Sequence, residues 1–261
     1  MPGLIDAHTH VFDGSLARAL RHGVTTELDM FCLPANLARQ RKPAADRDDI
    51  ADLRSASILA TPPGGHPTQL LAGDEATRES LGDAYGPFET ISDPRDAAAF
   101  VDARLVDGAD YLKVVIDDGA ATGGDLPVLG PAVVAALVEA AHAANLKVIA
   151  HVADAGATTI ALDAGVDGLA HVFSDADEPA AASLAARIAA QGVFVATTLV
   201  HLDGLLAANP VAPTVSPPRW SPPAPCARRA CRCSRGRTRT RSPRSTGRAC
   251  TASSSCWSWP A

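Results

Sequence analysis

The sequence predicts an α/β protein built as an incomplete (β/α)8 barrel, and three observations carry this prediction. Short apolar runs alternate with Ala- and Leu-rich stretches of helical spacing, which is the pattern of repeated βα units around a parallel sheet. About seven such runs precede position 200, whereas a closed barrel of this type needs eight. No Gly-x-Gly-x-x-Gly follows the first run, which disfavours the alternative, an open doubly wound sheet with a dinucleotide site.

The predicted strands are short and are separated by helical stretches with recognisable ends. Pro131 is expected to begin a helix, because apolar residues recur at helical spacing after it, and Asn145 to end it. Residues 157–164 form the next predicted helix, which Gly165 stops, and residues 183–191 form the last one. The predicted strands are residues 3–8, 25–30, 57–61, 111–116, 147–151, 168–171 and 193–197.

Length and composition fit one large globular domain and argue against a chain that is disordered as a whole. The 261 residues are 47% hydrophobic and 20% charged, with a formal net charge of −6. No apolar run reaches the roughly 18 residues of a membrane span, and residues 1–6 lack the basic flank and apolar core of an export signal. We therefore expect a cytoplasmic protein with no membrane partner.

Histidines recur at the carboxyl ends of the predicted strands, where a barrel places its active site. His8 and His10 lie at the end of the first strand, and alternation along a strand turns both toward one face. His151 and His171 end the fifth and sixth strands. A single histidine at such a position is more often a hydrogen-bonded structural residue than a ligand. Structural histidines have no reason to recur at the same end of three strands, which favours a shared site.

Lys113 lies within the fourth predicted strand among apolar neighbours. A lysine in an apolar strand is usually an edge residue whose ammonium reaches water. Its neighbours nevertheless suggest burial, and a buried cation is costly unless it is paired or chemically modified.

Three segments resemble the amidohydrolase superfamily. Residues 2–10, Pro-Gly-Leu-Ile-Asp-Ala-His-Thr-His, resemble the signature that opens its barrel, and residues 165–171 resemble its sixth-strand segment. Residues 109–113, Ala-Asp-Tyr-Leu-Lys, resemble the fourth-strand segment of its imidazolonepropionase-like and metal-dependent prolidase-like branch. The resemblance runs over roughly residues 2–205.

This resemblance implies a metal-dependent hydrolase that cleaves a C–N amide or cyclic amide bond in a small molecule or dipeptide. One or two divalent ions, usually zinc, acidify a water and polarise the scissile carbonyl in such enzymes. By the resemblance, His8 and His10 bind one ion, His151 and His171 bind the other, and Lys113, once carbamylated, bridges them. His66, in a Gly-Gly-His segment, resembles a residue near the substrate, and simple loop packing explains it equally well. A homo-oligomer is compatible with the sequence.

In the family, an aspartate at the end of the eighth strand binds metal and takes the proton from the metal-activated water. This chain has no candidate for that aspartate. No acidic residue follows Asp203, so no catalytic residue is identifiable. Family members also carry a small β-sandwich from segments flanking the barrel, and both segments are expected to be absent here. A catalytically inactive, metal-binding barrel is therefore the alternative to an active hydrolase.

The last 44 residues differ in composition from the rest of the chain. Residues 1–217 carry 13 Lys and Arg against 29 Asp and Glu, a net charge of −16, whereas residues 218–261 carry ten Arg and no acid. Five of the six Cys and all three Trp also lie in residues 218–261. A nucleic-acid-binding tail would explain the arginines. A metal or disulfide framework would explain the cysteines, although their spacing fits no recognised zinc motif.

The third interpretation is that residues 218–261 are translated out of frame. A shift of two bases permits Ala-Gly-Val-Pro-Val-Leu-Ala-Gly-Thr-Asp across 228–238, which is similar to the family's eighth strand, and a helical segment across 246–261. We favour this interpretation over the nucleic-acid tail and expect no nucleic-acid partner. The predicted division is a metal-dependent hydrolase barrel core, 1–217, and a disordered, out-of-frame tail rich in Arg, Ser, Pro and Cys, 218–261.

Overall fold

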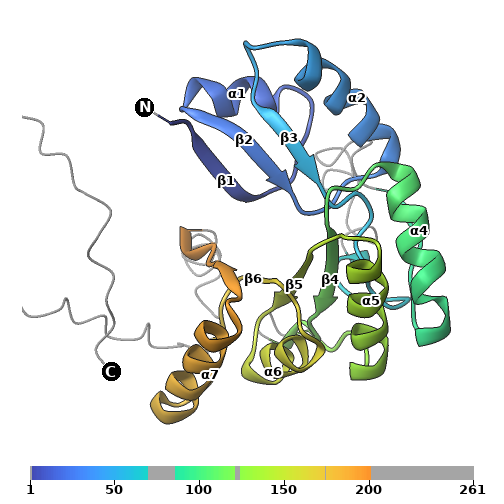
Figure 1. The fold of residues 1–261 in the computed structure, drawn as a ribbon, viewed down its shortest axis with the longest axis vertical. Helices are drawn as coiled ribbons and strands as arrows, with labels where there is room; N and C mark the ends of the chain where they lie inside the picture. Colours follow the sequence, from blue (N-terminus) through green and yellow to red (C-terminus); the bar gives the residue numbers. More distant parts are fainter. Residues whose placement is uncertain (1, 70–85, 121–123, 174, 201–261) are drawn as a thin grey trace, which may run out of the picture. The chain divides into compact units, whose positions relative to one another are not determined.

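The computed structural model describes residues 2–69, 86–120, 124–173 and 175–200, all within one unit, Met1–Val215. Within these residues, parallel strands form two sheets, ordered β1-β2-β3 and β4-β5-β6-β7 (Figure 1). The strands are β1 Leu4–Thr9, β2 Val24–Asp29, β3 Asp52–Ser55, β4 Leu112–Ile116, β5 Val148–Val152, β6 Gly168–Ala170 and β7 Phe194–Ala196. The helices are α1 Ser15–Arg21, α2 Pro34–Asp46, η3 Pro94–Asp96, α4 Ala97–Asp107, α5 Pro131–Ala143, α6 Ala155–Ala164 and α7 Glu178–Gln191.

The two sheets are joined through the segment that follows β3. Ala60 forms an isolated parallel bridge with Val114 of β4, in which its amide donates to the Lys113 carbonyl at 2.8 Å and its carbonyl accepts from the Val115 amide at 2.9 Å. The strands therefore follow one another in chain order around one wall. This confirms the predicted incomplete (β/α)8 barrel, whose described strands do not close into a ring.

The third predicted strand is misplaced. The regular strand is β3, and residues 57–61 instead cross toward β4. Burial alternates along β3, and Leu53 is its only large apolar residue. The strand therefore contains no apolar run that would mark it in the sequence. Ser57 has a φ of 55°, in the left-handed region, which ends the extended conformation before the crossing.

The helix ends follow from identifiable capping residues. Pro131 is the first residue of α5 and Asn145, with a φ of 59°, lies just beyond its end, as predicted. Helix α6 begins at Ala155, where the Asp154 carboxylate accepts from the Ala157 amide at 2.7 Å. Helix α7 begins five residues before the predicted start, because Asp177 caps it through the Ala180 amide at 2.9 Å. None of the described helices is long and apolar enough to cross a membrane.

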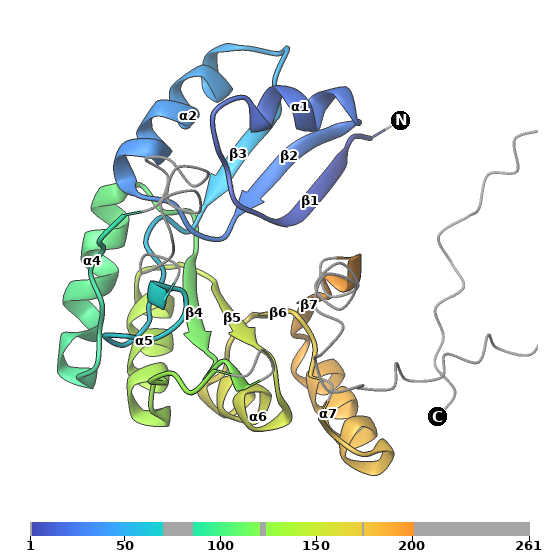
Figure 2. The ribbon, with the colours of Figure 1, turned by 180° about the vertical axis from the view of Figure 1, so that it is seen from behind.

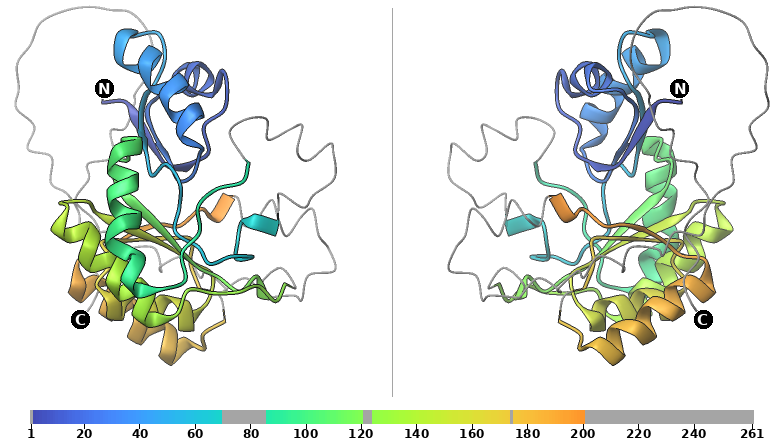
Figure 3. Two further views of the ribbon diagram at one scale, coloured as in Figure 1. Left: turned by 90° about the vertical axis from the view of Figure 1, so that its right-hand side faces the viewer. Right: turned by 90° about the vertical axis from the view of Figure 1, so that its left-hand side faces the viewer.

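Helices cover one face of each sheet, and the other face is the barrel interior. Helices α1 and α2 lie against the β1–β3 sheet (Figure 2), and α4 to α7 lie on one side of β4 to β7 (Figure 3). The larger apolar core lies between helices α4 to α6 and strands β4 to β6. A smaller cluster of buried residues consists of Met30, Ala56, Tyr111, Ile149 and Ala170.

Strands β1 and β7 are the outer strands of the two described sheets and expose apolar side chains. Leu4 and Ile5 of β1 are 63% and 64% exposed, and Phe194 of β7 is 44% exposed. Leu199 and Val200, just after β7, are exposed as well. Residues 201–261, which include the predicted tail 218–261, lie outside the described residues.

Candidate functional site

Five imidazoles gather at the carboxyl ends of the strands. The ring centroids of His8 and His10 lie 5.9 Å apart, and those of His8 and His171 lie 4.7 Å apart. His171 lies 4.4 Å from His151, and His151 lies 5.0 Å from His66. The structure thus brings the four predicted strand-end histidines together and adds His66, from the segment after β3, to the same cluster.

Lys113 of β4 is buried beside this cluster, with 2% of its surface exposed. Among the described residues its Nζ atom has no hydrogen-bond partner, and neither does the buried Nδ1 atom of His8. Burial lowers the pKa of Lys113 to about 7, so that much of the amine is neutral at physiological pH. Two buried polar atoms without protein partners therefore lie in one cluster, which is an arrangement that a bound ion or water would complete.

The imidazoles of His8, His66 and His151 are neutral at pH 7, because the pKa of each is lowered. Burial, followed by the charges of Lys113 and His171, holds the pKa of His8 far below its ordinary value. Burial also lowers the pKa of His151, and it lowers that of His66 to about 4. A neutral imidazole is the form that binds metal ions.

Hydrogen bonds fix the orientation of two of these rings. The Nδ1 atom of His10 lies 3.2 Å from the Phe31 carbonyl oxygen. Because a carbonyl can only accept, Nδ1 carries the proton and Nε2 carries the lone pair. The Nδ1 atom of His171 lies 2.5 Å from the Thr198 hydroxyl, and the φ of His171 is 72°, a sparsely populated conformation that is common at functional sites.

Asp117 is a site residue that the sequence analysis missed. It follows β4 and is 9% exposed. Its Oδ2 atom lies 3.0 Å from His151 Nε2, and its Oδ1 accepts from the Gly119 amide at 2.9 Å. Burial alone would raise the pKa of Asp117, but these two hydrogen bonds outweigh it and hold the pKa at about 2. The available signal was its position four residues beyond Lys113, directly after the strand.

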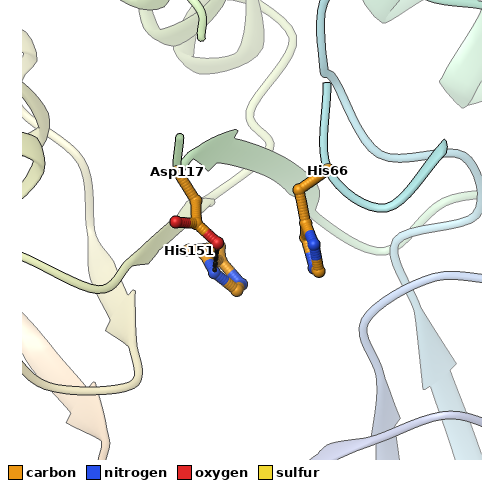
Figure 4. Close-up of side chains that lie close together, drawn as sticks. All are labelled: His66, Asp117 and His151. Carbon is orange, nitrogen blue, oxygen red and sulfur yellow. Dashed lines mark hydrogen bonds and ion pairs between the residues drawn. The ribbon is translucent and has the colours of Figure 1, made fainter. Parts of the chain in front are cut away.

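Asp117, His66 and His151 also form a compact group of ligand-type atoms (Figure 4). One atom from each lies within 4.8 Å of the others. The site therefore contains two overlapping donor sets that share His151: the lysine with four histidines, and this smaller group. Neutral imidazoles with a carboxylate suit divalent ions such as zinc, so the residues present fit the metal that the resemblance implies.

Asp29, at the end of β2, supports the segment that carries His10. This carboxylate is fully buried, and its oxygens accept from the Val11 amide at 3.0 Å and the Ser55 hydroxyl at 2.5 Å. Its backbone carbonyl accepts from the Tyr111 hydroxyl at 2.8 Å. Burial raises the pKa of Asp29, opposed by the Ser55 hydrogen bond. Asp29 thereby holds the residue next to His10 against the neighbouring strands.

Parallel strands with a cluster of imidazoles at their carboxyl ends define a barrel with a candidate cation site. The chain belongs to the amidohydrolase family, whose sequence model, described as "Amidohydrolase family", matches residues 1–244. This confirms the predicted superfamily, and the match extends beyond residue 217. No curated protein matches the chain.

Several solved structures share the fold. A Xaa-Pro dipeptidase with bound methionine is 20% identical, with a TM-score of 0.62 over 82% of this chain and 58% of the other. The ochratoxinase of A. niger is 23% identical, with a TM-score of 0.63 over 81% and 56%. A prolidase complexed with N-methylphosphonate-L-proline is 22% identical, with a TM-score of 0.59 over 82% and 58%. The chain thus spans less than three-fifths of the length of these proteins, and at this identity the likeness shows the fold alone.

Proposed function

We propose that this chain is a metal-dependent amidohydrolase that cleaves a C–N amide or cyclic amide bond in a small molecule. The observation that carries the proposal is the pair of buried atoms without protein partners, His8 Nδ1 and Lys113 Nζ, among the clustered imidazoles. The names of the structurally similar proteins, which include a Xaa-Pro dipeptidase and a prolidase, favour a dipeptide as substrate.

In this proposal the histidines hold one or two divalent ions, which we propose to be zinc. The proposed ligands are His8, His10, His151, His171 and Lys113. When bound, such an ion supplies Lewis acidity, which polarises a carbonyl group and acidifies a water molecule. The Phe31 carbonyl keeps the His10 proton on Nδ1, so that Nε2 offers its lone pair. We propose that His66 contacts the substrate.

Carbamylation of Lys113 would make its side chain a ligand. The neutral amine attacks carbon dioxide, an N–C bond forms, and the nitrogen loses a proton, which leaves an anionic carbamate. A pKa near 7 keeps enough of the amine neutral for this reaction. The anion would face cations instead of apolar surroundings, which removes the cost of a buried, unpaired ammonium.

A second candidate function is a metal-binding barrel without catalysis. The observation that favours it is the absence of any acidic residue after Asp203 in the sequence, where the family's proton-accepting aspartate is expected. We propose that residues 218–261 encode this aspartate in a shifted reading frame and that residues 1–217 are the barrel core. A nucleotide sequence that shows one uninterrupted frame across codons 200–220, in this gene and in related copies, would contradict the shift.

The direct experiment is an assay of the full chain loaded with zinc. Release of free amine from a panel of dipeptides and N-acyl amino acids is measured for the wild type and for His151→Ala. We expect hydrolysis of at least one substrate and its loss in the variant. Zinc binding without hydrolysis would favour the inactive barrel, and hydrolysis restored by correcting the frame would then identify the missing strand as the cause.

A further inference from the structure

The contact between Asp117 and His151 determines which nitrogen of His151 can bind a cation. An ionised carboxylate has no proton to give, so His151 donates from Nε2 to Asp117 Oδ2 across their 3.0 Å separation. An imidazole that binds a cation through one ring nitrogen keeps its proton on the other. With Nε2 donating to Asp117, the nitrogen of His151 that can bind a cation is Nδ1.

Asp117 is itself held in place on its other side. Its Oδ1 atom accepts from the Gly119 amide at 2.9 Å, so both carboxylate oxygens have protein partners. In the same group, His66 Nδ1 lies 2.8 Å from the Gln69 side-chain nitrogen. Within the histidine and lysine cluster, the buried atoms that lack partners among the described residues belong instead to His8 and Lys113. These contacts are typical of a residue that orients a metal-binding side chain, rather than of a residue that binds the metal itself.

We propose that Asp117 is a positioning residue that holds His151 in the tautomer with the proton on Nε2, so that Nδ1 is offered to the cation. This inference rests on the proposed function and adds a residue to it. Carboxylates that accept a hydrogen bond from a metal-binding histidine commonly fix its ring and raise its basicity. This proposal also gives a role to the Asp117 carboxylate, to which the resemblance to the family assigned none.

Asp118 provides a matched control. Its Oδ1 atom accepts from the Ala120 amide at 2.8 Å, which is the same turn contact that Asp117 makes with Gly119. Asp118 is exposed, whereas Asp117 is buried against His151. Asp118→Ala therefore removes the turn contact without touching the histidine cluster.

The first measurement is the tautomer of His151 in the metal-free full chain, from nitrogen-15 spectra of histidine-labelled protein. We expect the Nε2–H form in the wild type and in Asp118→Ala, and a mixture of tautomers in Asp117→Ala. Asp117→Asn, whose amide oxygen can still accept from Nε2, is expected to restore most of the wild-type signal and serves if the alanine variant does not fold. An unchanged tautomer in both Asp117 variants would overturn the inference.

The second measurement is the affinity for Co²⁺ alone, followed by its visible absorption. We expect Asp117→Ala to weaken binding by about 10–100-fold, as for other supporting carboxylates. We expect no change in Asp118→Ala or in His66→Ala. Equal losses in Asp117→Ala and His66→Ala would overturn the inference, because they would make both residues direct ligands. If the wild type binds no Co²⁺, the proposed function fails, whereas the tautomer measurement still decides the role of Asp117.

Discussion

His151 and His171, at the ends of the neighbouring strands β5 and β6, lie edge to face with their ring centroids 4.4 Å apart. Neither strand alone would mark a site, because each contributes one polar residue at the end of an apolar run. The parallel register of β5 and β6, in which His151 pairs with Ala170, brings the two rings together. A proton on either ring adds positive charge to a cluster that already contains Lys113.

The stability of the metal-free protein should therefore fall in mild acid. Burial is the largest cause that lowers the pKa of His66 from its ordinary value of 6.5 to about 4 in the folded protein. Between these two values the unfolded chain binds more protons than the folded one, so stability rises with pH across this window and is lost as pH falls through it. Melting temperatures in chelator between pH 4 and 8 measure the effect. His66→Ala should show a shallower dependence, and a wild-type melting temperature that rises on acidification would contradict this account.

Lys113→Met should stabilise the metal-free protein while abolishing cation binding. The variant removes a buried amine without a hydrogen-bond partner, whose burial costs about 1–3 kcal/mol in its neutral form and more in its charged form. The gain should shrink as pH rises from 7 toward 10.5, because the lowered pKa makes the unfolded chain bind more protons there. Urea denaturation in chelator measures it.

Lys147→Met is the control for the lysine prediction. Lys147 is exposed, and its Nζ lies 2.9 Å from Asp167 at the surface, so its loss should change stability by less than about 1 kcal/mol. A Lys113→Met protein that is less stable than the wild type would show that the amine has a stabilising partner.

Asp29→Ala should destabilise the fold by about 1–3 kcal/mol or more, because it leaves the buried Val11 amide and Ser55 hydroxyl without their shared acceptor. Asp29→Asn should cost less, since an amide oxygen can still accept from Val11 and the amide nitrogen can donate to Ser55. Urea denaturation compares the two variants. Equal losses would indicate that the charge, and not the hydrogen bonds, stabilises this region.

The exposed side of β1 should promote self-association without contributing to stability. Ile5 is 64% exposed on an outer strand of the described sheets, so Ile5→Ser should alter unfolding by less than about 0.5 kcal/mol. The same change should reduce light scattering at high protein concentration, because exposed apolar edge strands pair between molecules. Leu169→Ala, in buried β6, is the contrasting variant and should cost about 2–5 kcal/mol. If Ile5→Ser leaves the light scattering unchanged, the surface that self-associates lies elsewhere.

The sequence predicts most of the strands to within one or two residues, and β4 to β6 most simply, because buried parallel strands are continuous apolar segments. Strand β3 was not predicted, because its buried positions are Leu53 and Ser55, which form no apolar run. The helix α5 was predictable from Pro131 and its buried face, whereas the start of α7 depended on a capping aspartate whose role only the fold reveals.

The site was predictable where residues repeat at strand ends and not where single acids support them. His8, His10, His151 and His171 recur at one end of the barrel, and the structure brings them together. Asp117 and Asp29 are lone carboxylates beside strand ends, a position that loop residues also occupy. Their partners are distant in sequence, 34 residues for His151 and 26 for Ser55, so no local pattern marks them.

The most direct test of the central claim, that this histidine and lysine cluster binds divalent cations, is metal analysis of the purified full chain after loading with zinc. We predict at least one zinc ion per chain in the wild type, and its loss in His8→Ala and in His151→Ala while Asp118→Ala retains it. Absence of stoichiometric metal from the folded wild type under every loading condition would contradict the claim, as would zinc that remains in both histidine variants.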